Sequence, residues 1–323
     1  MIDEVTVCKV FENQDYSKKS YGRLEGITLK VVSIAFAVIM QIITKNLYVN
    51  SSITVMELLY WRGILIVLFN FSYARWINVD LLAVPKEQYK PMWYRSVIGG
   101  INNMLLFTST KLFPLSLISA MSYLSPMMTA GLSFLVLHES LSVYDVGSMI
   151  VAFCGVAIII FNPYKNSDFS EYYDIKWYYY LIPLIKPLFG SISTLLMRYM
   201  GTKIHCVMAP TFLGIVIGTF SPLLMLTFLS VKEMVTKYDG LVVIHLIAIG
   251  LAGAIAQILV SRSLQIEKAG RVQAFNYIKI VFTMSADVML FGIPIHWLDL
   301  IGITIILSSN LLVAVLKGCS IIK

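Results

Sequence analysis

Apolar residues fill most of this 323-residue chain in runs of about 20, separated by short polar stretches. A helix rises 1.5 Å per residue, so about 20 apolar residues cross the hydrocarbon core of a bilayer. The pattern predicts an all-α membrane protein with ten transmembrane helices: Gly26–Asn46, Thr54–Ala74, Met92–Leu112, Leu117–Leu137, Val143–Phe161, Trp177–Met197, Ile204–Leu229, Leu241–Leu264, Arg271–Phe291 and Trp297–Leu316.

Polar segments divide the predicted helices into two groups of five. A polar tail occupies residues 1–21, a linker occupies residues 162–176, and a short tail occupies residues 318–323. The two groups are residues 22–161 and 177–317. Most other turns are only a few residues long, so consecutive helices should form antiparallel hairpins.

The second group repeats part of the first. Residues 95–161 align with residues 249–315 without a gap, and the aligned pairs share Gly99/Gly253, Ile101/Ile255, Leu105/Leu259, Ser109/Ser263, Ala120/Ala274, Tyr123/Tyr277, Thr129/Thr283 and Asp145/Asp299. The same offset of 154 residues superimposes three hydrophobic segments and their turns, although chance similarity between apolar helices is the alternative. Because each group has an odd number of crossings, the second should enter the membrane inverted, giving two inverted five-helix repeats.

Composition and charge exclude a soluble protein and explain the basic character. The chain is 58% hydrophobic and 13% charged, with a formal net charge of +7. When the N-terminus is assigned to the cytosol, fifteen Lys and Arg residues, including Arg95, fall on that side, and six, including Lys45, fall on the other. This excess predicts that both termini are cytoplasmic and accounts for the charge without a nucleic-acid partner.

The sequence contains no pattern that predicts an enzyme, a cofactor or a metal site. The four cysteines have no paired spacing, and metalloprotease, phosphate-loop and nucleophile-elbow motifs are absent from the sequence. Small residues at Gly214, Gly218 and 250–256 predict close helix packing within the chain, with a homodimer face as the alternative.

Several segments resemble a known family. Ala120–Pro126 and Leu137–Ser142 resemble the first repeat of the drug/metabolite transporter superfamily, EamA type, and Lys268–Tyr277 resembles its second repeat. The stretch Glu57–Arg62 fits the same pattern, and the resemblance covers about residues 22–316. It implies ten helices in two inverted repeats, with transport by alternating access through a central cavity.

One position departs from the family pattern. The resemblance implies an acidic residue at the end of the fourth helix of each repeat, and Glu139 provides it in the first repeat. The offset places Ile293 at the equivalent position of the second repeat. Glu139 is therefore a candidate gating residue without a symmetric counterpart.

Two lysines are predicted near the middle of the membrane. Lys186 and Lys279 each lie about nine residues into a predicted helix, and a buried charge there costs several kcal/mol unless it meets a partner or water. The resemblance places both helices beside the central cavity, and phosphate-translocating relatives use basic residues there. We therefore hypothesise an anionic or phosphorylated substrate. The alternatives are that Lys279 pairs with Asp287, about 12 Å away along the helix axis, and that Lys186 reaches the interface or a loop carboxylate.

Three uncharged residues extend the candidate site. Tyr123 and Tyr277 occupy equivalent repeat positions, so their hydroxyls are candidates to bind substrate from opposite sides of the pseudo-twofold axis. Asn276 is adjacent and adds a polar group. Packing in the core or at the membrane interface is the alternative for both tyrosines.

Charged residues on two helices are candidates for coupling or gating. Glu57 and Arg62 are five residues apart, about 140° around the helix, so direct pairing is not expected. Arg62 is predicted to contact carbonyls of a neighbouring helix. Proton coupling through Glu57 or Asp287 and structural pairing of either residue are both open.

These observations predict a secondary transporter. It moves a small metabolite across a lipid bilayer by alternating access, with Lys186 and Lys279 supplying positive charge. The alternative is a membrane scaffold or assembly subunit that retains the fold without transport, in which side chains would fill the centre.

Overall fold

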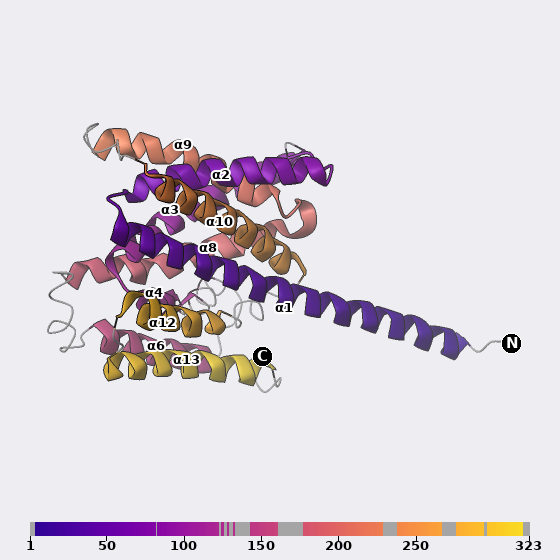
Figure 1. Cartoon of the computed structure of the whole chain (residues 1–323). Helices are drawn as coiled ribbons and strands as arrows, with labels where there is room; N and C mark the ends of the chain where they lie inside the picture. Colours follow the sequence, from indigo (N-terminus) through magenta and orange to yellow (C-terminus); the bar gives the residue numbers. More distant parts are fainter. Residues whose placement is uncertain are drawn as a thin grey trace.

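In the computed structural model, the described residues are 4–81, 83–122, 124–125, 128, 132, 143–160, 177–228, 238–266, 276–293 and 296–318. Regular structure within these ranges is entirely helical (Figure 1). The α-helices are α1 (Glu4–Asn50), α2 (Val55–Trp76), α3 (Lys86–Leu112), α4 (Leu115–Ser122), α6 (Val143–Ile160), α8 (Leu181–Met200), α9 (Met208–Phe228), α10 (Gly240–Ile266), α12 (Tyr277–Phe291) and α13 (Trp297–Gly318). Short 3₁₀ turns, Trp177–Tyr180 and Gly201–Lys203, flank α8.

Each predicted helical segment overlaps one of these helices, but some boundaries differ. Helix α1 continues to Asn50, beyond the predicted end at Asn46, and α3 begins at Lys86 instead of Met92. A prediction based on apolar runs does not include polar turns at the ends of a helix, so it places the helix ends too far inward. Lys45 and Arg95, which lie near the ends of the predicted helices, therefore lie further from the ends of the observed helices.

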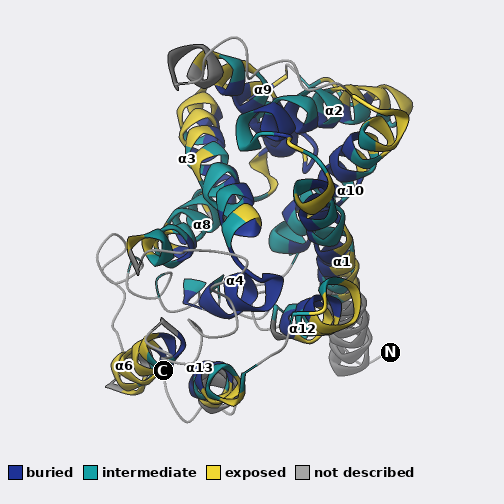
Figure 2. Ribbon diagram, turned by 60° about the vertical axis from the view of Figure 1, so that its left-hand side comes forward, coloured by how far each residue is buried: buried dark blue, intermediate teal, exposed yellow. Residues whose placement is uncertain are grey.

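The helices have the length and composition of a membrane protein. In the described ranges, four helical segments are long and apolar enough to cross a bilayer: Glu25–Asn50, Val55–Trp76, Tyr178–Met197 and Gly240–Ile266. Apolar side chains such as Leu241, Val281 and Met289 are exposed. Figure 2 shows exposed residues along helices such as α2, α3 and α6. Apolar surface on this scale is expected where lipid covers the protein.

The main helix contacts join the two halves of the chain. Helix α1 packs along α10, α2 along α9, α3 along α8, α4 against α12, and α6 along α13 (Figure 1). Each pair combines a helix from before the linker with one from after it. The two halves therefore interlock, and any space at the centre is lined by both.

Small residues allow the closest of these contacts. A Cβ atom added to Gly63 on α2 would lie 2.5 Å from the backbone nitrogen of Gly218 on α9, and one added to Gly155 on α6 would lie 2.9 Å from the carbonyl oxygen of Gly302 on α13. Distances this short exclude any side chain without a shift of the helices. Gly214 also packs against α2, and Gly250 packs against Leu65, so these glycines serve contacts within the chain.

Candidate functional site

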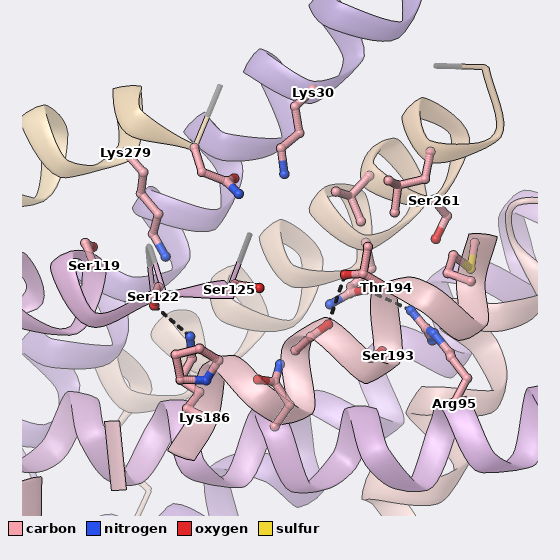
Figure 3. A pocket seen from close by; sticks show the side chains of 18 residues that line it. Lys30, Arg95, Ser119, Ser122, Ser125, Lys186, Ser193, Thr194, Ser261 and Lys279 are labelled. Atoms are coloured by element: carbon pink, nitrogen blue, oxygen red, sulfur yellow. Dashed lines mark hydrogen bonds between the residues drawn. The ribbon is translucent and has the colours of Figure 1, made fainter. Parts of the chain in front are cut away.

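A polar cavity of about 240 Å³ lies between α1, α3, α4, α8, α10 and α12 (Figure 3). Four cationic side chains from four helices line it: Lys30 on α1, Arg95 on α3, Lys186 on α8 and Lys279 on α12. Serines from α4, α8 and α10 supply hydroxyl groups. The described residues that line the cavity include no carboxylate.

The cavity follows one face of α8. Lys186, Gly190, Ser193 and Met197 line it, and these residues are three to four positions apart, so they share a face of the helix. The ammonium group of Lys186 donates a hydrogen bond to Oγ of Ser122 on α4 at 2.9 Å. Within the described chain, Lys186 thus bonds a neutral hydroxyl, which does not balance its positive charge.

Lys279 and Lys30 approach the same space from other helices. Lys279 lies in the first turn of α12 and interacts electrostatically with both Lys186 and Lys30. Figure 3 shows Lys279 and Lys186 pointing toward Ser122, with Lys30 directed into the cavity from α1. Across the described ranges, no hydrogen bond or ion pair is found for the ammonium group of Lys30 or of Lys279. Mutual repulsion among three such groups would be relieved by an anion.

Arg95 belongs to the cavity, although its sequence position suggested a helix end. Its side chain is 4% exposed and donates from Nη1 to the carbonyl oxygen of Ala209 at 2.8 Å and from Nη2 to Oε1 of Gln257 at 3.4 Å. The sequence did contain a signal for this position: Arg95, Gly99 and Asn102 are spaced for one helical face. Because α3 begins at Lys86, Arg95 lies more than two turns inside the helix and not at its first turn.

Asp287 lies away from this cluster of cations and holds a turn. Its carboxylate is fully buried and accepts hydrogen bonds from the backbone N–H groups of Leu115 at 3.0 Å and Ser116 at 2.6 Å, the first residues of α4. The buried ammonium group of Lys45 interacts electrostatically with Asp287 and donates to the carbonyl oxygen of Phe113 at 3.0 Å. A carboxylate at a helix N-terminus satisfies otherwise unpaired donors and interacts favourably with the helix dipole. Asp287 is therefore bound to α4, and no ion pair joins it to Lys279 among the described residues.

Glu57 sits in a capping box at the start of α2. The backbone N–H of Glu57 donates to Oγ1 of Thr54, and the Thr54 backbone N–H donates to the Glu57 carboxylate, both at 3.3 Å. Tyr238, which precedes α10, donates its hydroxyl to the same carboxylate. Burial, together with this hydrogen bond, raises the pKa of Tyr238 to about 12, so the hydroxyl stays protonated near neutral pH. These contacts join the α2 N-terminus to the segment before α10.

Arg62 is also buried outside the cavity. Its Nη1 donates to Oδ1 of Asn103 on α3 at 2.7 Å, and its guanidinium lies 5.2 Å from the centre of the Phe107 ring. The expected contact with backbone carbonyls of a neighbouring helix is replaced by this side-chain amide. Glu57 and Arg62 form no ion pair with each other in the described chain, as their helical spacing suggested.

The remaining sequence candidates are placed only in part. Asn276 lines the cavity, as does Ser125, which the 154-residue offset aligns with Lys279. Tyr277 begins α12, but its side chain lies outside the described structure. Tyr123 and Glu139 lie outside the described residues. Their roles stay predictions.

The fold and site together define a class of protein: a helical membrane protein with a buried polar cavity between two interlocked halves. The family of EamA-like transporters matches residues 24–161 and, a second time, residues 177–315. The chain therefore belongs to the EamA-like transporter family, as its sequence motifs indicated. Membership makes it an integral membrane protein of a transporter family, and not an enzyme.

Individual proteins agree with this assignment. The chain is 26% identical to a probable transport protein of Saccharomyces cerevisiae, over 93% of this chain and 90% of that protein. It is 25% identical to solute carrier family 35 member G1 of Homo sapiens, over 72% of this chain and 64% of that protein. A crystal structure with 15% sequence identity aligns over 90% of this chain and 96% of its own, with a TM-score of 0.63, and has a similar fold.

Proposed function

We propose that this protein is a secondary transporter that moves a small anionic metabolite, with phosphorylated metabolites included, across a membrane by alternating access. The observation that carries the proposal is the cavity, where four cationic side chains meet and no described lining residue is acidic. Charge-assisted hydrogen bonds from ammonium and guanidinium groups are strong in a water-poor site, so the natural occupant is an anion.

The helix contacts support two inverted repeats within ten spans. If α1, α2, α3 and α4 correspond to α8, α9, α10 and α12, the contact of α1 with α10 corresponds to that of α8 with α3. The contact of α2 with α10 likewise corresponds to that of α9 with α3, and α1 with α12 to α8 with α4. Matching contacts of this kind are expected when the two halves are related by a pseudo-twofold axis. In many secondary transporters, this axis passes through a central binding site.

The position of the cavity suggests which side is open. Lys30 lies near the start of the apolar span Glu25–Asn50 of α1, Arg95 lies toward the N-terminal end of α3, and Ser261 lies toward the C-terminal end of α10. All three ends belong to the side that the distribution of basic residues assigns to the cytosol, together with both termini. The Asp287 contact with the α3–α4 turn lies at the other end. We therefore assign this structure to a state with the site on the cytoplasmic side.

The cavity also distinguishes transport from a scaffold role. A scaffold that had lost transport would gain stability from a filled centre, because buried unpaired cations are costly. Retaining several of them around a cavity is better explained by a ligand that balances their charge. Glu57 and Asp287 make structural contacts, so we place substrate binding on the lysines and give these carboxylates no part in it.

Thermal unfolding of the purified protein with glycerol 3-phosphate and with glycerol tests the proposal. A ligand that binds only the folded state at about 100 times its Kd stabilises it by about 2.7 kcal/mol. We expect glycerol 3-phosphate, but not glycerol, to raise the Tm of the wild type, and Lys186→Ala and Lys279→Ala to lose most of that rise. Lys203→Ala is the matched control, because Lys203 is exposed outside the cavity. Equal shifts in the wild type and both cavity variants would refute the anion site and leave family membership intact.

A further inference from the structure

Three residues that line the cavity each carry a buried polar atom for which the described part of the chain supplies no hydrogen-bond partner. These atoms are Nε of Arg95, Oδ1 of Asn102 and Oγ of Ser261. A buried polar atom without a partner costs about 1–3 kcal/mol, and proteins rarely leave several in one place. Unpaired buried atoms also occur outside the cavity, as at Gln41 and Asn70, but here three of them belong to residues around one cavity and are separate from the lysines.

These atoms lie at some distance from Lys186. Asn102 approaches Gly190, where an added Cβ would lie 3.4 Å from Oδ1, and an added Cβ on Gly99 would lie 3.7 Å from Oγ of Ser193. Arg95 is one helical turn from Gly99. Seven residues of α8, roughly 10 Å along its axis, separate Lys186 from Ser193. Figure 3 shows the same separation, with Lys186 and Lys279 at one end and Arg95 at the other.

Arg95 is suited to bind an anionic group itself. Its two described acceptors, the Ala209 carbonyl and the Gln257 side-chain amide, are neutral, so neither balances the guanidinium charge. Its buried Nε–H has no hydrogen-bond partner among the described residues. A guanidinium can present parallel donors to a carboxylate or phosphate, whereas an ammonium acts as a point charge. One end of the cavity thus presents two ammonium groups, and the other presents one guanidinium group.

We propose that the cavity binds a solute with two separated anionic groups, one held by Lys186 and Lys279 and the other by Arg95. Asn102 and Ser261 contact the polar middle or the second group of that solute. The inference rests on the proposed function and narrows its substrate class. A volume of about 240 Å³ is below the range of roughly 300–1,000 Å³ typical of drug-sized ligands, so the solute has a short carbon chain. Arg95 then determines specificity for the second charge.

Binding of matched probes tests this assignment. Succinate and butyrate have the same chain length and differ by one carboxylate. In the same way, 3-phosphoglycerate carries a carboxylate that glycerol 3-phosphate lacks. We expect the wild type to bind the probe with two anionic groups at least tenfold more tightly in one of these pairs. The pair that shows the preference identifies the first anionic group as carboxylate or phosphate.

Arg95→Gln should remove the preference while leaving affinity for the probe with one anionic group nearly unchanged. Arg95→Lys should retain part of the preference, because it keeps the positive charge. This variant also tests the site if Arg95→Gln folds poorly. Lys279→Ala should weaken both members of the preferred pair. Arg75→Gln, at an exposed arginine on α2, is the matched control.

The outcomes separate the two proposals. Equal weakening of both probes by Arg95→Gln and Arg95→Lys would make Arg95 a general structural contact and overturn the inference. An unchanged preference in both Arg95 variants, with Lys279→Ala still weakening both probes, would also overturn it but support the proposed function. Failure of the wild type to bind any of these anions would count against both.

Discussion

Two groups of charged residues in the described structure, one at the α3–α4 turn and one in the cavity, differ in how their charges are balanced. Around the α3–α4 turn, Asp287 accepts two backbone hydrogen bonds and interacts with the ammonium group of Lys45. In the cavity, Lys186, Lys279 and Lys30 face one another with no acidic residue among the described lining. The fold itself supplies the counter-charge in the first group and leaves it to a ligand in the second. Burial alone therefore does not reveal which charges are functional; the partners do.

The largest expected effect is loss of stability when the balanced group is broken. Asp287→Ala leaves the N–H groups of Leu115 and Ser116 unpaired and removes the negative charge near Lys45. Removing one member of a buried charged network costs about 3–5 kcal/mol. We expect a loss of this size in the free energy of unfolding, measured by denaturant titration in detergent. A loss below about 1 kcal/mol would show that Asp287 does not hold the turn.

Two neighbouring asparagines on α3 sharpen the comparison. Asn103 bonds Arg62 and the Gly99 carbonyl, both at 2.7 Å, whereas Asn102 lines the cavity with an unpartnered oxygen. Asn103→Ala should therefore cost about 1–3 kcal/mol of stability, because it leaves the Arg62 guanidinium unpaired. Asn102→Ala should leave stability nearly unchanged and weaken ligand binding. Thermal unfolding with and without glycerol 3-phosphate measures both, and a reversed order would contradict the assignment.

A smaller effect of opposite sign is expected in the cavity. Lys279→Met removes a buried charge that Lys186 and Lys30 repel, and it preserves much of the side-chain volume. Replacing a poorly balanced buried charge with an apolar residue is often neutral or stabilising, so we expect a gain of about 1 kcal/mol in ligand-free stability. A clear drop in the Tm would mean that a partner balances Lys279 in the ligand-free protein.

The smallest effect is expected at the surface. Arg262 and Glu25 approach to 3.9 Å with side chains 49% and 54% exposed. Exposed pairs contribute about 0–1 kcal/mol, and salt weakens them further. Glu25→Gln should therefore change the free energy of unfolding by less than about 1 kcal/mol, which makes it a control for Asp287→Ala. A larger change in the free energy of unfolding would indicate that the contact between Arg262 and Glu25 stabilises the packing of α1 against α10.

The sequence located helical segments and pointed to two residues that line the cavity, for physical reasons. Apolar run length located the helices, and depth within them brought attention to Lys186 and Lys279, which the structure places in one cavity. It could not place Arg95, because the polar turns that begin α3 hide its depth. It also could not assign Asp287, whose partners on α4 are 171 and 172 residues away in sequence. Contacts of that range depend on how the halves dock.

A comparison of Lys45→Met with Lys279→Met tests most directly how the charges at the α3–α4 turn differ from those in the cavity. The measurement is the ligand-free Tm of each variant together with the rise in Tm that glycerol 3-phosphate produces. We expect Lys45→Met to lower the ligand-free Tm and keep the ligand-induced rise. Lys279→Met should keep or raise the ligand-free Tm and lose the ligand-induced rise. Two results would contradict a division between structural and ligand-binding charges. In one, both variants lose ligand-free Tm and the ligand-induced rise alike; in the other, Lys45→Met loses only the rise and Lys279→Met lowers only the ligand-free Tm.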